Sequence, residues 1–296
     1  CEKIQKQVRE LRGRSIEIAQ VDADDVGQTV ELLRRVQPDL LINLSPWELP
    51  STSDMVQLGR TITPAVANGL INNMDPEVRR ICATVLSATR DPAAMQPLLD
   101  ALEDPDYGVQ AQAIEALSTL EGDEAAPALL ALISKPRVPT WTRDQAVVAL
   151  GRRGDPEAVK PLMRYFLRTW DSSAQRALWD LRRHLTPAQR TQLVVAPLKA
   201  RRPDAVPWDV LSFSIDKAGR LQITAAAKPL RSLADERPDM QNKIIWSLGM
   251  IGDRSSVPYL QGLLDETADA RLLNNVVFAL DRLGEDVEPF LAQALD

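Results

Sequence analysis

Twelve basic residues gather in the middle of this 296-residue chain, and charge recognition is the chemistry that they could perform. They lie between residues 152 and 202 with only four acidic residues, so this basic central segment has a net charge of +8. Residues 253–296 have the opposite balance, with three basic and nine acidic residues and a net charge of −6. The basic central segment therefore predicts an acidic partner, although charges on solvated outer faces are the structural alternative.

One stripe within the basic central segment combines arginine with tryptophan. If Ala174 and Leu178 form the buried side of a helix, Arg176, Trp179 and Arg183 share another side at spacing i, i+3 and i+7. Tryptophan beside arginine suits contacts with acidic peptides or nucleic acid. Alternatively, Trp179 fills the seam to the next repeat beneath arginine stems. The predicted partner-binding residues are this stripe and two further arginines of the segment: Arg164, Arg168, Arg176, Trp179 and Arg183.

The residues that catalytic or metal sites usually need are scarce. The chain has one histidine, His184, so it has neither a histidine-rich metal site nor an H-E-x-x-H motif. We expect His184 to meet the carbonyl end of a helix. There is no G-x-S-x-G, P-loop or Cys-x-x-Cys, and the cysteines Cys1 and Cys82 form no disulfide framework, Cys82 being predicted to be buried. We therefore predict no catalytic residues, no metal and no cofactor, and a paired-carboxylate site remains open.

Prolines followed by apolar residues recur about every 32 residues, which indicates internal repeats. They stand at positions 64, 97, 127, 161, 197, 229, 258 and 289. Glycine before these prolines ends one helix, and aspartate caps the next, as in the Asp-Pro pairs at 75–76, 91–92, 104–105 and 155–156. Each repeat then has a second helix, such as residues 142–155, where Ala146, Val147 and Leu150 form one apolar face. Two such helices per repeat predict a stacked helical solenoid.

These residues resemble the short HEAT repeat of the phycobilisome-lyase type, with the form V-R-x-x-A-x-x-A-L-G-x-x-G-D. Val78 and Arg79 match it, as does the run from Arg143 through Ala146 and Ala149-Leu150-Gly151 to Gly154-Asp155. The resemblance implies a mainly α fold over residues 60–296, a right-handed α-α solenoid of about seven repeats. It also implies structural pairing for Arg79 and Arg143. Residues 203–236 depart from the pattern, with an irregular second helix and a bend expected at Gly219.

The first 44 residues follow another pattern, in which helices alternate with short apolar strands. This α-β-α-β order is typical of a Rossmann-like fragment with a parallel sheet. The stretches "EIAQVDADD" and "VQPDLLINL" resemble the NADP-binding domain of the saccharopine and carboxynorspermidine dehydrogenase family, which would place Asp22 and Asn43 near the cofactor. The phosphate-binding G-x-G-x-x-G is missing, so we expect no NADP binding. Residues 45–59 are predicted to be a linker.

The expected function is that of a non-enzymatic scaffold or adaptor that binds a protein partner through the concave solenoid face and the basic central segment. Nucleic-acid binding, as in HEAT-like DNA glycosylases, is an alternative that the net charge of −6 disfavours. A bilin lyase-like or chaperone role and a remnant oxidoreductase activity also stay open. No apolar run is long enough to span a membrane, and we expect a cytoplasmic protein whose oligomeric state the sequence leaves open.

Overall fold

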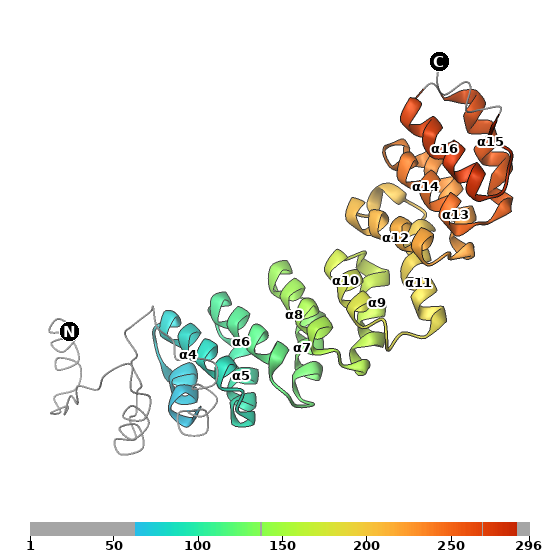
Figure 1. The fold of residues 1–296 in the computed structure, drawn as a ribbon. Coiled ribbons are helices and arrows are strands. Elements are labelled where there is room, and N and C mark those ends of the chain that lie inside the picture. Colours follow the sequence, from blue (N-terminus) through green and yellow to red (C-terminus); the bar gives the residue numbers. More distant parts are fainter. Residues whose placement is uncertain (1–62, 137, 268, 289–296) are drawn as a thin grey trace, which may run out of the picture. The chain divides into compact units, whose positions relative to one another are not determined.

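The computed structural model describes residues 63–136, 138–267 and 269–288, and these residues form helices and turns without a strand (Figure 1). They contain seven consecutive helix pairs, which confirms the predicted repeat arrangement, whereas the right-handed sense of the solenoid remains a prediction. The predicted Rossmann-like fragment, its boundary at residue 44 and the linker 45–59 lie outside the described residues. The chain divides into two compact units, Cys1–Ala125 and Ala126–Asp296, and each is described by itself.

The first unit contains two helix pairs within its described part. Residues 63–72 form a helix that precedes α4 (Pro76–Thr89), and α5 (Met95–Asp100) precedes α6 (Tyr107–Thr119). The helices α4 and α6 pack side by side, which buries Leu86 and Leu117 completely. Cys82 of α4 is buried as predicted, with 8% of its surface exposed. Burial raises the pKa of its thiol to about 11, which keeps the thiol protonated at neutral pH.

The second unit contains five helix pairs, whose members form two rows. The first-helix row consists of α7 (Ala125–Ser134), α9 (Val159–Thr169), α11 (Pro187–Leu198), α13 (Ala227–Glu236) and α15 (Val257–Glu266). The second-helix row consists of α8 (Thr140–Arg153), α10 (Ser172–Asp180), α12 (Trp208–Arg220), α14 (Gln241–Ile251) and α16 (Ala270–Arg282). Successive members of the second-helix row contact each other, and Figure 1 shows these helices following one another along the unit.

The recurrent prolines mark the first helices, as the sequence predicted. Pro97, Pro161 and Pro229 are each the third residue of α5, α9 or α13, directly after a short 3₁₀ turn. Proline fits there because N–H groups in the first turn of a helix have no partner within the helix. Pro197 differs, since it is the eleventh residue of α11, a helix that begins at Pro187 behind a Thr186 capping box. In this repeat the first helix begins well before its recurrent proline. This early start explains why the spacing from Pro161 to Pro197 is the widest of the series.

Two of the four expected Asp-Pro caps form and two do not. Asp75 and Asp91 accept hydrogen bonds from backbone N–H groups at the starts of α4 and the following 3₁₀ turn, as predicted. Asp104 does not cap a helix, because its carboxylate binds Arg79 while Asp106 caps α6. Asp155 stands at the cap position of a 3₁₀ turn, but its side chain pairs with Arg153 instead. A nearby guanidinium binds each of these two carboxylates, and Asp104 also accepts a hydrogen bond from the backbone N–H of Asp106, before α6 begins.

The prediction of an irregular helix with a bend at Gly219 is wrong. The helix α12 continues through Gly219 to Arg220, and Gly219 lies where α12 meets α14. A Cβ atom at Gly219 would stand 2.8 Å from Ser247 Oγ. Likewise, a Cβ at Gly151 would stand 2.8 Å from Ala177 Cα, and one at Gly249 would stand 2.7 Å from Ala279 Cα. Glycines in the second helices therefore permit close approach of the next second helix.

Candidate functional site

The structure places four of the five predicted site residues on two helices that belong to different rows, and the fifth in a turn. Arg164 and Arg168 lie on α9 of the first-helix row, whereas Arg176 and Trp179 lie on α10 of the second-helix row. Arg183 was predicted to continue the α10 stripe, but α10 ends at Asp180 and Arg183 follows in a turn. The five residues therefore do not form one stripe. Their role in binding a partner remains a prediction.

The turn after α10 places the Arg183 side chain beside the end of α8. The Arg183 guanidinium lies 3.0 Å from the position that a Cβ on Gly154 would take, at the end of α8. Its Nε atom donates a hydrogen bond of 2.9 Å to Nε2 of His184. We expected the His184 side chain to contact backbone carbonyls, whereas the structure gives its ring an arginine donor. Arg183 therefore lies beside the end of α8 and is hydrogen-bonded to His184.

Most of the basic central segment faces solvent. Eleven of its twelve basic side chains are exposed, and Arg153, which pairs with Asp155, is the exception. Of the four acidic residues only Glu157 and Asp180 are exposed. Asp155 pairs with Arg153, and Asp171 caps α10. The positive charge found in the sequence is therefore a property of the surface.

Trp179 contacts the next helix of the second-helix row. Its ring meets that of Phe213 edge to face, with centroids 5.4 Å apart and an interplanar angle of 82°. The Nζ atom of Lys217 lies 5.1 Å from the centroid of the Trp179 ring and 5.3 Å from that of Phe213. The Arg182 guanidinium covers the same tryptophan at 5.8 Å. Trp179 therefore joins α10 to α12, as the seam interpretation requires, and it remains partly exposed.

A group of charged side chains continues from this seam along α12. Asp216 accepts hydrogen bonds from Arg220 Nε at 2.7 Å and from Lys217 Nζ at 3.2 Å. Burial alone would raise the pKa of Asp216, but the hydrogen bonds from Arg220 and Lys217 lower it on balance. Asp216 is therefore a carboxylate at neutral pH and is shared by two cations.

Lys243 extends the charged group from α12 to α14. Its Nζ atom donates a hydrogen bond to Ser212 Oγ and lies 6.0 Å from the centroid of the Trp208 ring. Lys243 is half-buried, and burial lowers the pKa of its ammonium group although the charge of Asp216 acts in the opposite direction. Trp208, by contrast, is 59% exposed. We call the following side chains the α12 cluster: Trp179, Trp208, Ser212, Phe213, Asp216, Lys217, Arg220 and Lys243.

A second group of ionisable residues lies deeper, between α8, α9 and α10. Burial and the neighbouring Asp171 carboxylate raise the pKa of Asp144, against the attraction of Arg143. Burial also raises the pKa of Tyr165 beside the same residues. Arg143 donates hydrogen bonds to the carbonyl groups of Lys135 and Val138, which supports the structural role predicted for it. A pair of neighbouring carboxylates, which the sequence left open, is therefore present as Asp144 and Asp171, between packed helices.

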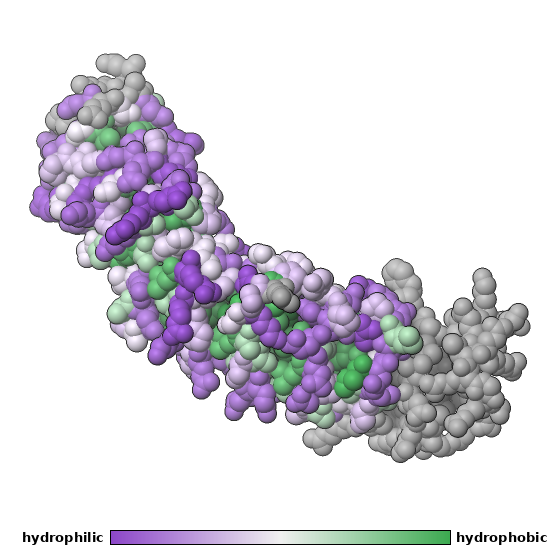
Figure 2. All heavy atoms as spheres, turned by 180° about the vertical axis from the view of Figure 1, so that it is seen from behind, coloured by the Kyte–Doolittle hydropathy of each residue, from purple (hydrophilic) through white to green (hydrophobic). Residues whose placement is uncertain are grey.

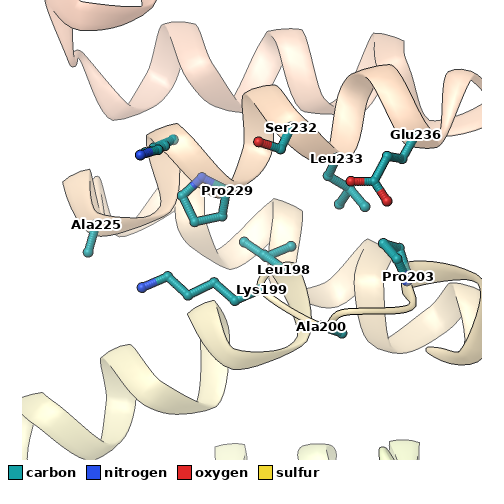
Figure 3. Close-up of a pocket in the computed structure, with 10 residues that line it drawn as sticks. Leu198, Lys199, Ala200, Pro203, Ala225, Pro229, Ser232, Leu233 and Glu236 are labelled. Carbon is teal, nitrogen blue, oxygen red and sulfur yellow. The ribbon is translucent and has the colours of Figure 1, made fainter.

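A shallow pocket of about 510 Å³ lies in the first-helix row between the end of α11 and α13 (Figure 3). Leu198 and Pro229 form apolar walls, Lys199 stands at one end and Glu236 at the other. Figure 2 shows one face of the molecule, on which hydrophobic residues form separate spots among hydrophilic ones. Within the described ranges, no group of three or more potential ligand side chains could hold a metal ion. None of the described helices is long and apolar enough to cross a membrane.

Sequence reasoning missed the α12 part of the cluster. Phe213, Lys217 and Trp208 lie in the stretch that departs from the repeat pattern, where we expected only an irregular second helix and did not identify a regular helix side. The signal was present, because Phe213 and Lys217 have the i, i+4 spacing of one helix side. Their link to Trp179 depends on how α10 meets α12, which no local pattern specifies.

Comparisons with known proteins agree with this repeat architecture. A family model for HEAT repeats matches residues 63–140, and one for PBS lyase HEAT-like repeats matches residues 142–167 and 241–266. Neither match extends into residues 1–44, so the resemblance to a dehydrogenase fragment finds no support there. No curated protein sequence matches the chain.

Solved structures with some similarity include human deoxyhypusine hydroxylase in complex with glycerol, at 18% identity and a TM-score of 0.39, covering 77% of this chain and 99% of that one. Another is the complex of CpcE and CpcF of phycocyanin lyase from Nostoc sp. PCC7120, at 20% identity and a TM-score of 0.38, covering 91% of this chain and 100% of that one. The family models, and not these structures, identify HEAT repeats at residues 63–140 and PBS lyase HEAT-like repeats at residues 142–167 and 241–266.

Proposed function

We propose that this chain is a non-enzymatic repeat scaffold that holds an acidic protein partner through its basic central segment and the adjoining second-helix row. The observation that carries the proposal is the surplus of exposed cations, eleven against two exposed carboxylates within residues 152–202. A single exposed ion pair contributes only about 0–1 kcal/mol. Clustered contacts add up, and they raise the association rate with a partner of opposite charge.

Three of the exposed arginines are also free to make such contacts. Arg164, Arg168 and Arg176 make no ion pair with any described residue. Their charges are therefore not neutralised by ion pairs within the protein, in contrast to those of Arg79 and Arg153. Helical repeats provide an extended surface for such a partner, since each repeat contacts only its neighbours and leaves its outer sides open.

The test is capture of partners from a cell lysate by the immobilised chain, with and without nuclease, at low and physiological ionic strength. We expect one or more acidic proteins to be captured in both nuclease conditions and to be released as salt screens the contacts. The decisive variant is Arg164→Glu/Arg176→Glu, with one substitution on each helix. Its matched control is Arg271→Glu/Arg282→Glu, which makes the same charge change on two exposed arginines of α16.

The proposal predicts that the first double variant loses captured protein at least tenfold while the control retains it. Equal capture by the two variants contradicts a role for the basic central segment. Loss of all captured material after nuclease treatment contradicts a protein partner and favours nucleic acid. Circular dichroism of both variants must match the parent, so that loss of helix is not mistaken for loss of contact.

A further inference from the structure

Lys243 is a half-buried ammonium group without a carboxylate of its own. Its Nζ atom donates to Ser212 Oγ, and no described carboxylate lies within ion-pair distance of it. The charged groups that act on it are Asp216, Arg220 and Lys217, of which only Asp216 is negative. A partly buried charge that lacks an ion-pair partner is unfavourable, so a second carboxylate would be stabilised here.

The charges of the α12 cluster do not balance. Lys217, Arg220 and Lys243 contribute three positive charges, and Asp216 contributes one negative charge. Asp216 already accepts hydrogen bonds from Lys217 and Arg220, so its single negative charge is shared with those two cations and does not form an ion pair with Lys243. The surface between α12 and α14 therefore has an excess of positive charge, which an added anion would offset.

An exposed aromatic ring lies beside Lys243. Trp208 begins α12 with 59% of its surface exposed, and its ring centroid is 6.0 Å from Lys243 Nζ. Tryptophan in such a position offers a large apolar contact area with little loss of side-chain freedom on binding. A partner that places an acidic group on Lys243 can therefore place an apolar side chain on Trp208.

We propose that the α12 cluster is the docking site for an extended acidic segment of a protein partner, with an Asp or Glu side chain on Lys243 and a neighbouring apolar side chain on Trp208. Packed helices lie about 8–10 Å apart. An extended chain advances about 3.3 Å per residue, so roughly three residues bridge adjacent second helices. This proposal rests on the proposed function, because it identifies where the acidic protein binds.

The same surface disfavours nucleic acid. A phosphate backbone places negative charges at regular short intervals and would bring one of them near Asp216. Beyond α14 the chain becomes acidic, with only Arg254, Arg271 and Arg282 as basic residues after position 252. A peptide can alternate acidic and apolar side chains to match this pattern, whereas a polynucleotide cannot.

The experiment selects binders for the immobilised chain from a displayed library of random 12-residue peptides, in parallel with two variants. Lys243→Met removes the charge and keeps a linear apolar stem. Lys228→Met is the matched control, because Lys228 is an exposed lysine of α13 in the other row. We expect peptides selected on the parent to be enriched in Asp or Glu next to aromatic or aliphatic residues. A selected peptide, labelled with fluorescein, is then titrated against each protein by fluorescence anisotropy.

The expected result is binding at least tenfold weaker to Lys243→Met, and also weaker to Trp208→Ala, with Lys228→Met equal to the parent. Replacing the acidic residues of the peptide with Gln or Asn should cause the same loss. Selection without acidic enrichment, or equal affinity for Lys243→Met and the parent, overturns the proposal, as does equally tight binding of a 12-nucleotide single-stranded DNA. If lysate capture still depends on Arg164 and Arg176 while Lys243→Met captures normally, only this docking site fails and the scaffold function stands.

Discussion

Arg79 and Asp104 join two successive repeats of the first unit through a pair of parallel hydrogen bonds. Arg79 Nε donates to Oδ2 at 2.7 Å and Nη2 donates to Oδ1 at 2.8 Å, while Nη1 donates to the carbonyl groups of Asn73 and Met74. The arginine side chain is 10% exposed and the aspartate side chain 8%. Since every group has a partner, this ion pair holds α4, the preceding turn and the next repeat in one arrangement.

Removing either partner of this pair should destabilise the first unit. Arg79→Ala leaves the Asp104 carboxylate buried without its cation, and such losses amount to about 3–5 kcal/mol. Thermal unfolding followed by circular dichroism measures the effect. The control is Arg80→Ala, because Arg80 pairs with Glu77 on the exposed side of α4, where a loss of about 0–1 kcal/mol is expected. Equal shifts for the two variants would contradict the structural role of Arg79.

The Arg79–Asp104 ion pair also predicts that the stability of the first unit depends on pH. Burial opposes ionisation of Asp104, but the hydrogen bonds from Arg79 and from the Asp106 backbone lower its pKa on balance. The stabilisation is therefore present above the pKa of the unfolded chain, about 3.9, and is lost as the pH falls through the lower folded value. Asp104→Asn should remove this part of the acid sensitivity, which unfolding midpoints between pH 3 and pH 7 would reveal.

Two glycines in helices should respond to alanine in opposite directions. Gly249→Ala on α14 would place a Cβ 2.7 Å from the Ala279 backbone on α16, so the helices must separate, which destabilises by about 1–3 kcal/mol. Gly262→Ala on α15 would meet no atom within 4 Å, and the higher helix propensity of alanine should stabilise by about 0.5–1 kcal/mol. Thermal midpoints that move in the same direction would show that close approach does not explain Gly249.

The repeat period and most of the core followed from the sequence because they depend on local spacing. Proline positions predicted the first helices, and apolar residues at helical spacing predicted the buried faces, as at Ala146 and Leu150. Glycine identity alone did not distinguish a bend from a close contact at Gly219, since that depends on the neighbouring helix. Likewise, the α12 cluster requires the packing of α10, α12 and α14, which lie about thirty residues apart along the chain.

Asp144 should lower the stability of the second unit at neutral pH. Burial and Asp171 raise its pKa, so the folded protein holds this proton to a higher pH than the unfolded chain does. The free energy of unfolding that ionisation of Asp144 removes therefore grows as the pH rises from about 4 through the pKa of Asp144 in the folded protein. Asp144→Asn cannot ionise and should unfold at a higher temperature than the parent at pH 7, with a smaller difference at pH 4. Asp180→Asn is the control, because it makes the same substitution at an exposed aspartate of α10.

The contact between Trp179 and Phe213 permits a direct test of the seam between α10 and α12. Edge-to-face ring pairs contribute about 0.5–1.5 kcal/mol beyond the area that they bury. Trp179→Ala should destabilise the protein by up to about 3–5 kcal/mol, because a large seam side chain is lost. Trp208→Ala should cost much less, since that ring is 59% exposed.

A double-mutant cycle separates the ring contact from simple loss of volume. Trp179→Ala, Phe213→Ala and the double variant are unfolded by urea, and the coupling free energy is the departure from additivity. We expect a coupling of about 0.5–1.5 kcal/mol for the Trp179–Phe213 pair. The control cycle combines Trp179→Ala with Phe278→Ala, because Phe278 lies on α16, two second helices beyond α12, and is 38% exposed. Coupling in the control as large as in the test pair would mean that Trp179 acts through general stability and not through α12.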